Sequence, residues 1–139
     1  MLTRYGLSGT FYIPRKIETG VMTDAQVREL SNQFEVGAHT LNHVFVSDTG
    51  SATAQAEISG SRQWVMDVTG RSCEMFCPPA GRYSRHHLPM FQSAGFSGIR
   101  SVEFCSLDDP RRRGGIAEMP TTLQAFEHRR KSYLKNIAK

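Results

Sequence analysis

The sequence predicts an α/β fold with mostly parallel strands. Short runs of β-branched and aromatic residues alternate with segments of helical periodicity along the 139 residues, and this alternation favours parallel pairing through right-handed crossovers. With 39% hydrophobic residues, the chain can bury one core but is too short for two domains. A complete eight-stranded barrel needs about 250 residues, and at least about 200. We therefore expect a single domain over residues 1–139 that forms a partial or distorted (β/α) barrel.

The first half of the chain is expected to contain two strands and two helices. A strand is predicted over residues 9–14 (GTFYIP), where aromatic and β-branched residues lie between Gly and Pro. A helix should begin after Thr23, because Thr23 and Gln26 have the spacing of a capping box. Residues 34–38 (FEVGA) predict the second strand. The second helix is predicted from apolar residues at helical spacing and a glycine at the expected C-cap, namely Ala54, Ile58, Val65, Val68 and Gly70.

The second half should add strands to the same sheet. Residues 73–77 (CEMFC) predict a strand that stops at two prolines, since consecutive prolines cannot continue a central ladder. A helix is expected over residues 88–95, with Pro89 in its first turn, followed by a strand over residues 96–102. We then expect a polar, Arg-rich loop, a short strand over residues 116–119 and a basic terminal helix that carries Phe126, Leu134 and Ile137.

Charge, hydropathy and cysteine content argue against several functions. The net charge is +4, but no aromatic residues are interleaved with the three arginines at 111–113, so we expect solvated surface and no nucleic-acid site. No apolar stretch is long enough to cross a membrane, and the N-terminus lacks the apolar core of a signal peptide. We expect a cytoplasmic chain as given, although a longer N-terminus could carry an export signal. The odd number of cysteines favours core thiols at Cys73, Cys77 and Cys105.

The strongest chemical signal is a pair of histidines four residues apart. The segment HTLNH (39–43) directly follows the second predicted strand. Residues at i and i+4 lie on one face of a helical turn, so His39 and His43 are expected close enough to bind one metal ion. In parallel α/β folds the loops at the carboxyl ends of strands form the binding face. The segment CPPAGRY (77–83) follows another predicted strand, so both segments should face one cleft.

Other catalytic patterns are absent from the sequence. A zincin protease would have Glu directly after the first His, where this chain has Thr40. Neither the G-x-S-x-G pattern of a nucleophile elbow nor a glycine-rich phosphate loop occurs. His86 and His87 are adjacent, so their side chains should point apart at the surface. Trp64 lies beside the apolar stripe of the long helix and is expected in helix–sheet packing.

Three segments, in the same order, resemble a known family. YGLSGTFYIP is similar to the strand after the family's first motif, FEVGAHTLNH matches its metal-binding H-[ST]-x-x-H motif, and FCPPAGRYS is similar to its third motif. AGFSGIRSV and MPTTLQ resemble downstream segments. Over residues 5–124 the chain thus resembles polysaccharide deacetylases of the NodB-like class, carbohydrate esterase family 4, and it would be incomplete at both ends.

The resemblance implies a fold, a reaction and a site. The fold would be a partial or distorted barrel of the NodB type, and the reaction would be hydrolysis of N- or O-acetyl groups on a polysaccharide or sugar. His39 and His43 would hold a divalent metal ion, zinc being the one expected, and Thr40 would steady their loop. The backbone N–H of Ala80 could serve the oxyanion. The residues expected to bind the oxyanion and the substrate are Pro79, Ala80, Gly81, Arg82 and Tyr83.

The sequence departs from the family pattern at the catalytic residues. The Asp-Asp pair that would supply the base and a third metal ligand does not occur before the first resembling segment, so no catalytic residue is assigned. Catalytic zinc normally has three protein ligands, and conceivable third ligands are Asp48, Asp108 and Asp109. The expected partner is an acetylated carbohydrate. The alternative is an inactive remnant that binds metal, sugar or a protein partner, and an unpaired sheet edge would permit a homodimer.

Overall fold

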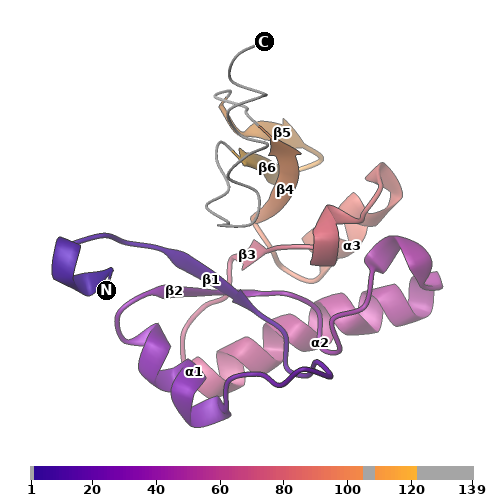
Figure 1. The fold of residues 1–139 in the computed structure, drawn as a ribbon. Helices are drawn as coiled ribbons and strands as arrows, with labels where there is room; N and C mark the ends of the chain where they lie inside the picture. The colour runs from indigo at the N-terminus through magenta and orange to yellow at the C-terminus, as the bar shows by residue number, and fades with distance from the viewer. Residues whose placement is uncertain (1, 105–108, 122–139) are drawn as a thin grey trace, which may run out of the picture.

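A six-stranded sheet forms the centre of the fold. The computed structural model describes residues 2–104 and 109–121. The strand order is β1-β2-β3-β4-β6-β5, in which all neighbours are parallel except β5, which is antiparallel to β6. The strands, shown in Figure 1, are β1 Thr10–Ile13, β2 Glu35–Ala38, β3 Met75–Phe76, β4 Gly98–Phe104, β5 Arg111–Arg113 and β6 Ile116–Thr121. The predicted α/β fold with mostly parallel strands is confirmed.

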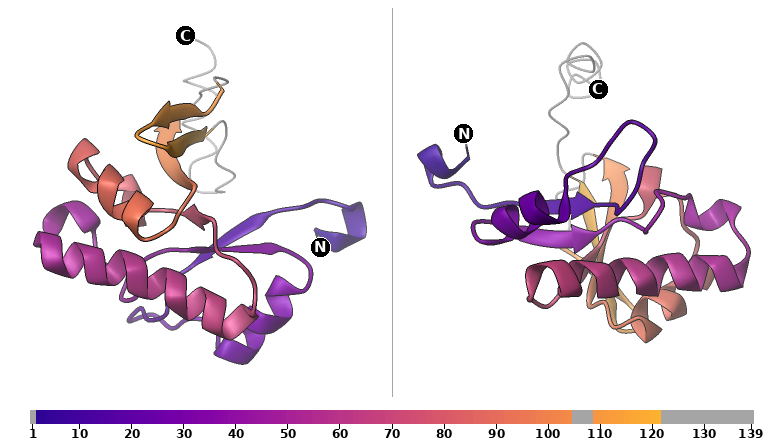
Figure 2. Two further views of the ribbon diagram at one scale, coloured as in Figure 1. Left: turned by 180° about the vertical axis from the view of Figure 1, so that it is seen from behind. Right: turned by 90° about the horizontal axis from the view of Figure 1, so that it is seen from below.

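Three α-helices cover one face of this sheet. They are α1 (Asp24–Ser31), α2 (Ser51–Thr69) and α3 (Leu88–Ser93), and each follows a strand of the sheet in the chain. Figures 1 and 2 show α2 running along the sheet, with α1 near one of its ends and α3 near the other. Because strand side chains alternate between the two faces, the strand residues on one face of the sheet can pack with the helices in one core. These strand residues are Ile13, Val36, Ala38, Phe76, Ile99 and Ile116.

Both helix-boundary signals read from the sequence are confirmed. The Thr23 side chain accepts a hydrogen bond from the Gln26 backbone N–H, and the Gln26 side chain accepts one from the Thr23 backbone N–H at 2.8 Å. At the other end, Gly70 caps α2 with φ of 67°, and its N–H donates to the Met66 carbonyl at 2.8 Å. Such caps satisfy backbone groups that a helix terminus leaves without partners.

The predicted Arg-rich loop is instead a strand. Residues Arg111–Arg113 form β5, and Arg113 is paired with Ile116 of β6. The two residues between them, Gly114 and Gly115, have φ of 54° and 85°. Two consecutive residues at positive φ make the tight turn that suits a two-residue hairpin, and Gly-Gly adopts it without steric cost. The glycine pair, rather than the charge of the arginines, therefore determines the local structure.

Strand β3 is shorter than the predicted span of residues 73–77. Its regular part is Met75–Phe76. The next residue still pairs across the sheet, since the Cys77 N–H donates to the Ala38 carbonyl at 2.9 Å. The ladder then ends at Pro78, which has no N–H to donate. Cys73 and Cys77 are free thiols, as expected.

The described strands form an open barrel segment with two edges. β1 and β5 are the edge strands, and an exposed edge can pair with another strand, so a homodimer stays a prediction. Within residues 2–104 and 109–121, no helix is both long and apolar enough to cross a membrane. The predicted terminal helix with Phe126, Leu134 and Ile137 lies outside the described residues, as does Cys105.

We expect Phe76→Ala to destabilise the protein by about 3–5 kcal/mol, because truncating a buried aromatic side chain removes apolar contacts and leaves a cavity. Phe76 is fully buried, and its ring centroid lies 4.9 Å from that of Phe91 and 5.2 Å from that of Phe96. Tyr5, at 67% exposure, provides the control: Tyr5→Ala should change the unfolding free energy by less than about 0.5 kcal/mol. Urea denaturation followed by circular dichroism measures the unfolding free energy of both variants. Equal changes in the two would contradict the burial of Phe76 in the core.

Candidate functional site

His39 and His43 lie together at the carboxyl end of β2. His39 directly follows Ala38, the last residue of the strand, and the centroids of the two imidazole rings are 5.0 Å apart. The expectation of a helical turn is wrong, because Thr40 and His43 have φ of 62° and 55° and the segment is a tight loop. Left-handed backbone at residues other than glycine costs about 1–3 kcal/mol each. Contacts elsewhere in the site must offset this strain.

The orientation of His39 is fixed by the neighbouring strand. Its Nδ1 lies 2.5 Å from the carbonyl oxygen of Cys77. A carbonyl only accepts hydrogen bonds, so Nδ1 carries the proton and Nε2 keeps a free lone pair. Burial lowers the pKa of His39 below its usual value, although the bond to Cys77 opposes this shift. The lowered pKa favours the neutral ring, and the bond to Cys77 favours the tautomer that metal-ligating histidines usually adopt, with the second ring nitrogen bonded to a carbonyl.

A buried carboxylate on α2 holds the loop between the histidines. Glu57 is 7% exposed, and it accepts hydrogen bonds from the backbone N–H groups of Leu41 and Asn42, both at 2.9 Å. It also accepts one from the Asn42 side-chain amide at 2.6 Å. Hydrogen bonds to a charged acceptor are stronger than neutral ones. Glu57 thus ties the histidine loop to the helix layer.

The rest of this loop is anchored by backbone bonds and by packing. Thr40 is fully buried, and its hydroxyl donates to the His39 carbonyl at 2.6 Å, in line with its predicted role in steadying the loop. The Leu41 carbonyl accepts from the Lys16 N–H at 2.8 Å. The Leu41 side chain lies so close to Gly60 of α2 that a Cβ there would be 2.6 Å from it. The loop therefore has little freedom to move relative to α2.

The second predicted segment makes a tight turn at the end of β3. Pro79–Gly81 form a short 3-10 turn, in which the Gly81 and Arg82 N–H groups donate to the carbonyls of Pro78 and Pro79 at 2.8 and 3.1 Å. Ala80 is exposed at the top of this turn with φ of 52°. Its N–H donates to none of the described backbone carbonyls. The predicted role of the Ala80 N–H group in binding an oxyanion stays a prediction.

Arg82 links this turn to the histidine segment. Its guanidinium pairs with Asp48 at 3.0 Å and lies over the Phe45 ring, 4.5 Å from the ring centroid. Hydrogen bonds from Ser47 and then from Arg82 hold the pKa of Asp48 below its usual value. Because both charged side chains are about half exposed, the ion pair contributes little to stability. It does show that residues 45–48 and the turn at residues 79–82 lie side by side.

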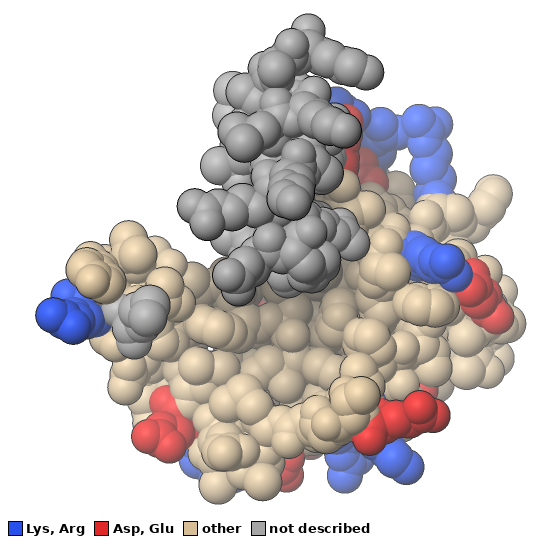
Figure 3. Space-filling model, viewed as in Figure 1, with Lys and Arg blue, Asp and Glu red and all other residues tan. Residues whose placement is uncertain are grey.

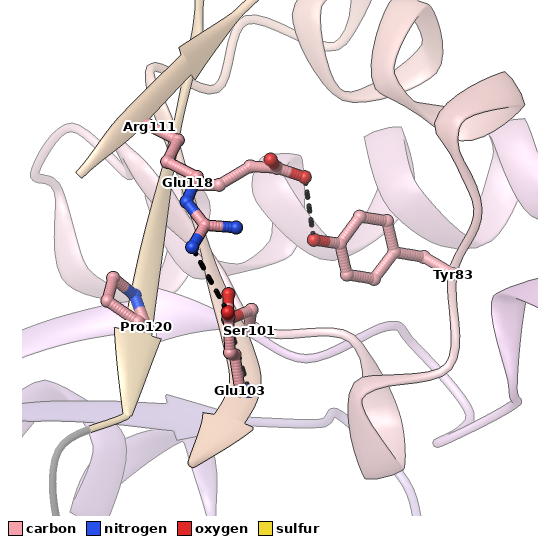
Figure 4. Close-up of a pocket in the computed structure, with 6 residues that line it drawn as sticks. All are labelled: Tyr83, Ser101, Glu103, Arg111, Glu118 and Pro120. Atoms are coloured by element: carbon pink, nitrogen blue, oxygen red, sulfur yellow. Dashed lines mark hydrogen bonds and ion pairs between the residues drawn. The ribbon is translucent and has the colours of Figure 1, made fainter. Parts of the chain in front are cut away.

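Tyr83 points towards β6, where it anchors the far end of the turn. Figure 4 shows its hydroxyl pointing at Glu118. Both side chains line a small cavity of about 30 Å³, room for about one water molecule. The hydroxyl donates to Glu118 at 2.8 Å, and Arg113 pairs with the same carboxylate at 2.8 Å. The Tyr83 ring packs edge-on against Phe91 at 6.0 Å. Burial raises the pKa of Tyr83 well above its usual value. Its predicted contact with a sugar stays a prediction.

The histidine pair has no third ligand among the described residues. No group of three or more His, Cys, Asp and Glu side chains there is arranged to hold a metal ion. Asp48 is engaged with Arg82, and neither it nor Asp109 joins His39 and His43. Asp108 lies outside the described residues. The donor set shown by the structure is therefore two imidazoles.

Glu57 was not predicted as a site residue, although the residue pattern of α2 indicates it. The buried residues of α2 follow one stripe, and Glu57 and Ser61 lie on this stripe between apolar residues. A carboxylate on the buried stripe of a helix needs hydrogen-bond donors. Such a position indicates a structural or functional partner, which in this protein is the histidine loop.

We expect Glu57→Ala to destabilise the protein by about 2–4 kcal/mol, since it leaves the partly buried backbone N–H groups of Leu41 and Asn42 without their acceptor. The backbone N–H groups of Leu41 and Asn42 should also exchange with solvent faster, as measured by amide hydrogen exchange. Asn42→Ala removes only one of the three bonds and should cost about 1–2 kcal/mol. Glu29→Ala, at an exposed carboxylate of α1, is the matched control. Unchanged exchange at both amides in Glu57→Ala would refute the anchoring role.

Comparisons with known proteins identify the family. A family model described as polysaccharide deacetylase matches residues 1–99. No curated protein sequence matches the chain. Solved structures do share the fold. The putative polysaccharide deacetylase from Mycobacterium smegmatis is 17% identical with a TM-score of 0.73, covering 86% of this chain and 42% of that one.

Two further structures extend this similarity. The deacetylase PplD of Streptococcus pyogenes, solved in complex with acetate, is 15% identical with a TM-score of 0.65, covering 96% of this chain and 60% of that one. A mutant of a CE4 family pseudoenzyme is 14% identical with a TM-score of 0.58, covering 99% of this chain and 54% of that one. The chain thus spans 42% to 60% of the lengths of these structures. Because the family model covers residues 1–99 of 139, the chain belongs to the polysaccharide deacetylase family.

Proposed function

We propose that the chain carries out metal-dependent hydrolysis of N- or O-acetyl groups on a polysaccharide or sugar. The observation that carries this proposal is the paired placement of His39 and His43, with His39 held by the Cys77 carbonyl. The family supports an acetylated carbohydrate as the substrate. The pseudoenzyme among the similar structures means that family membership alone does not imply activity.

The two imidazoles fit part of a metal centre. Neutral imidazole nitrogen is a normal ligand of zinc and of other divalent transition metals. His39 would bind through Nε2, because its Nδ1 is bonded to Cys77. A divalent ion held there would polarise the acetyl carbonyl and make water more acidic. Two protein ligands are fewer than the three that are usual for catalytic zinc, so the proposal requires a further ligand beyond those in the described residues.

The chain's own residues would act on the substrate from two sides. The N–H of Ala80, an exposed residue at the top of its turn, could donate a hydrogen bond to the negative charge that develops on the acetyl carbonyl oxygen. Gly81, with φ of 66°, fits this turn without strain. Arg82 is exposed beside the turn and could donate hydrogen bonds to sugar hydroxyls once it leaves Asp48.

A second candidate function is an inactive member that binds metal or carbohydrate. It is favoured by the lack of a three-ligand group among the described residues. In this case the loop around His39 and His43 would retain its shape, because Glu57 and Leu41 hold it independently of any ion. Metal binding and acetate release therefore have to be measured separately.

Zinc titrated into the metal-stripped protein should bind with one-to-one stoichiometry in a calorimeter. His43→Ala should weaken this binding by more than about 100-fold, since even residues outside the ligand set change zinc affinity by about 10–100-fold. His86→Ala, at an exposed histidine elsewhere, should leave the affinity unchanged. Weak binding that is insensitive to His43→Ala would contradict the metal site.

Acetate release from N-acetylated glucosamine oligomers should depend on added zinc and should be lost in His39→Ala. The physical reason is that His39 would supply a ligand nitrogen that no described neighbour can replace. An enzymatic acetate assay with and without a chelator measures this dependence. Tight zinc binding without any acetate release would favour the second candidate over the first.

A further inference from the structure

An open hollow lies beside the histidine pair, at the carboxyl ends of β1 and β2. It has about 530 Å³ of space, within the range of about 300–1,000 Å³ that is typical of small-ligand sites. The end of β1 forms one part of its wall through Tyr12, Ile13 and Pro14, and His39 and His43 form another. The remaining wall comes from Gln26 of α1 and from the segment between β1 and α1, including Ile17, Val21 and Met22. The hollow therefore continues the candidate site in one direction.

The wall of this hollow is largely apolar. None of the described residues that line it is Asp, Glu, Lys or Arg. Val21 and Met22 are 39% and 37% exposed, among the most exposed large apolar side chains of the described residues. In the part of this face that grey atoms leave uncovered, Figure 3 shows no charged side chains near the centre and several around the margin. Exposed apolar surface that adjoins polar groups marks a ligand site more often than plain surface.

The polarity of the wall distinguishes between kinds of ligand. Outside the histidine pair, its polar side-chain groups are those of Tyr12, Thr19 and Gln26. A sugar ring carries several hydroxyl groups, each of which needs a hydrogen-bond partner when water is removed. An alkyl chain needs only apolar wall. The hollow therefore matches a ligand with one polar end, near the imidazoles, and an aliphatic remainder.

We propose that this hollow binds a linear acyl chain longer than acetyl, with its carbonyl end at His39 and His43 and its alkyl chain against Ile17, Val21 and Met22. The substrates would then be sugars that carry medium-length N- or O-acyl groups as well as acetyl groups. The position of the carbonyl end rests on the proposed hydrolytic function. Binding of the alkyl chain does not require any reaction, so it is tested in the absence of metal.

The test is a binding series of N-acetyl-, N-butanoyl- and N-hexanoylglucosamine with the full 139-residue chain, free of metal. Affinity should rise about two- to fourfold per added methylene, since full burial of one methylene gives at most about fourfold. Backbone amide shifts in NMR spectra measure the affinity, and the methyl shift of Met22 should report where the chain lies. Equal affinity for the three compounds would overturn the inference.

Variants distinguish binding in the hollow from nonspecific hydrophobic binding. Val21→Asn and Met22→Gln should remove most of the gain for the hexanoyl compound and leave the weak binding of the acetyl compound unchanged. Leu7→Gln is the matched control, because Leu7 is also apolar and is 55% exposed but does not line the hollow. If the hexanoyl compound still gains its full affinity over the acetyl compound in both Val21→Asn and Met22→Gln, the inference is wrong. If affinity still rises with acyl length but no acyl group is released in the presence of zinc, the proposed hydrolysis is wrong and the proposed binding in the hollow is retained.

Discussion

The backbone of Cys77 joins the two halves of the candidate site, and the rest of the site depends on this connection. Its N–H donates to the Ala38 carbonyl at 2.9 Å, and its carbonyl accepts from His39 Nδ1 at 2.5 Å. These bonds extend the parallel pairing of β2 and β3 by one residue, into the loops that follow both strands. A register slip of one residue would turn the strand side chains to the opposite faces of the sheet. The position of the histidines is therefore a consequence of strand register.

Side chains on the helices and on β6 also hold the loops of the site. Glu57 reaches the histidine loop from α2, and Tyr83 reaches Glu118 on β6 after packing against Phe91 of α3. Among the residues that the structure describes, three other than glycine have positive φ, and all three lie in the two loops of the site: Thr40, His43 and Ala80. Such strain persists only where the surroundings determine the backbone strongly. The core thus serves the site by fixing α2 and β6 at positions from which these side chains can reach the loops.

The sequence predicted the parts of the fold that depend on local pattern. The capping box at Thr23, the C-cap at Gly70 and the apolar stripe of α2 involve neighbours in the chain, so spacing was enough to locate them. The proximity of His39 and His43 was also predicted, but for the wrong reason, because a loop held by residues from other elements replaces the expected helical turn. Glu57 acts on residues 15 and 16 positions away. Spacing within one element cannot reveal a contact of that kind.

We propose that the protein holds His39 ready to bind a metal ion before any ion is present. The most direct measurement is a long-range proton–nitrogen NMR spectrum of the imidazole rings, recorded without metal and then with increasing zinc. We expect His39 to be protonated at Nδ1 in the metal-free protein, and its Nε2 signal to shift at the same zinc concentration as that of one nitrogen of His43, while the His86 signals stay unchanged. An Nε2-protonated His39, or rings that respond to zinc independently of one another, would contradict it.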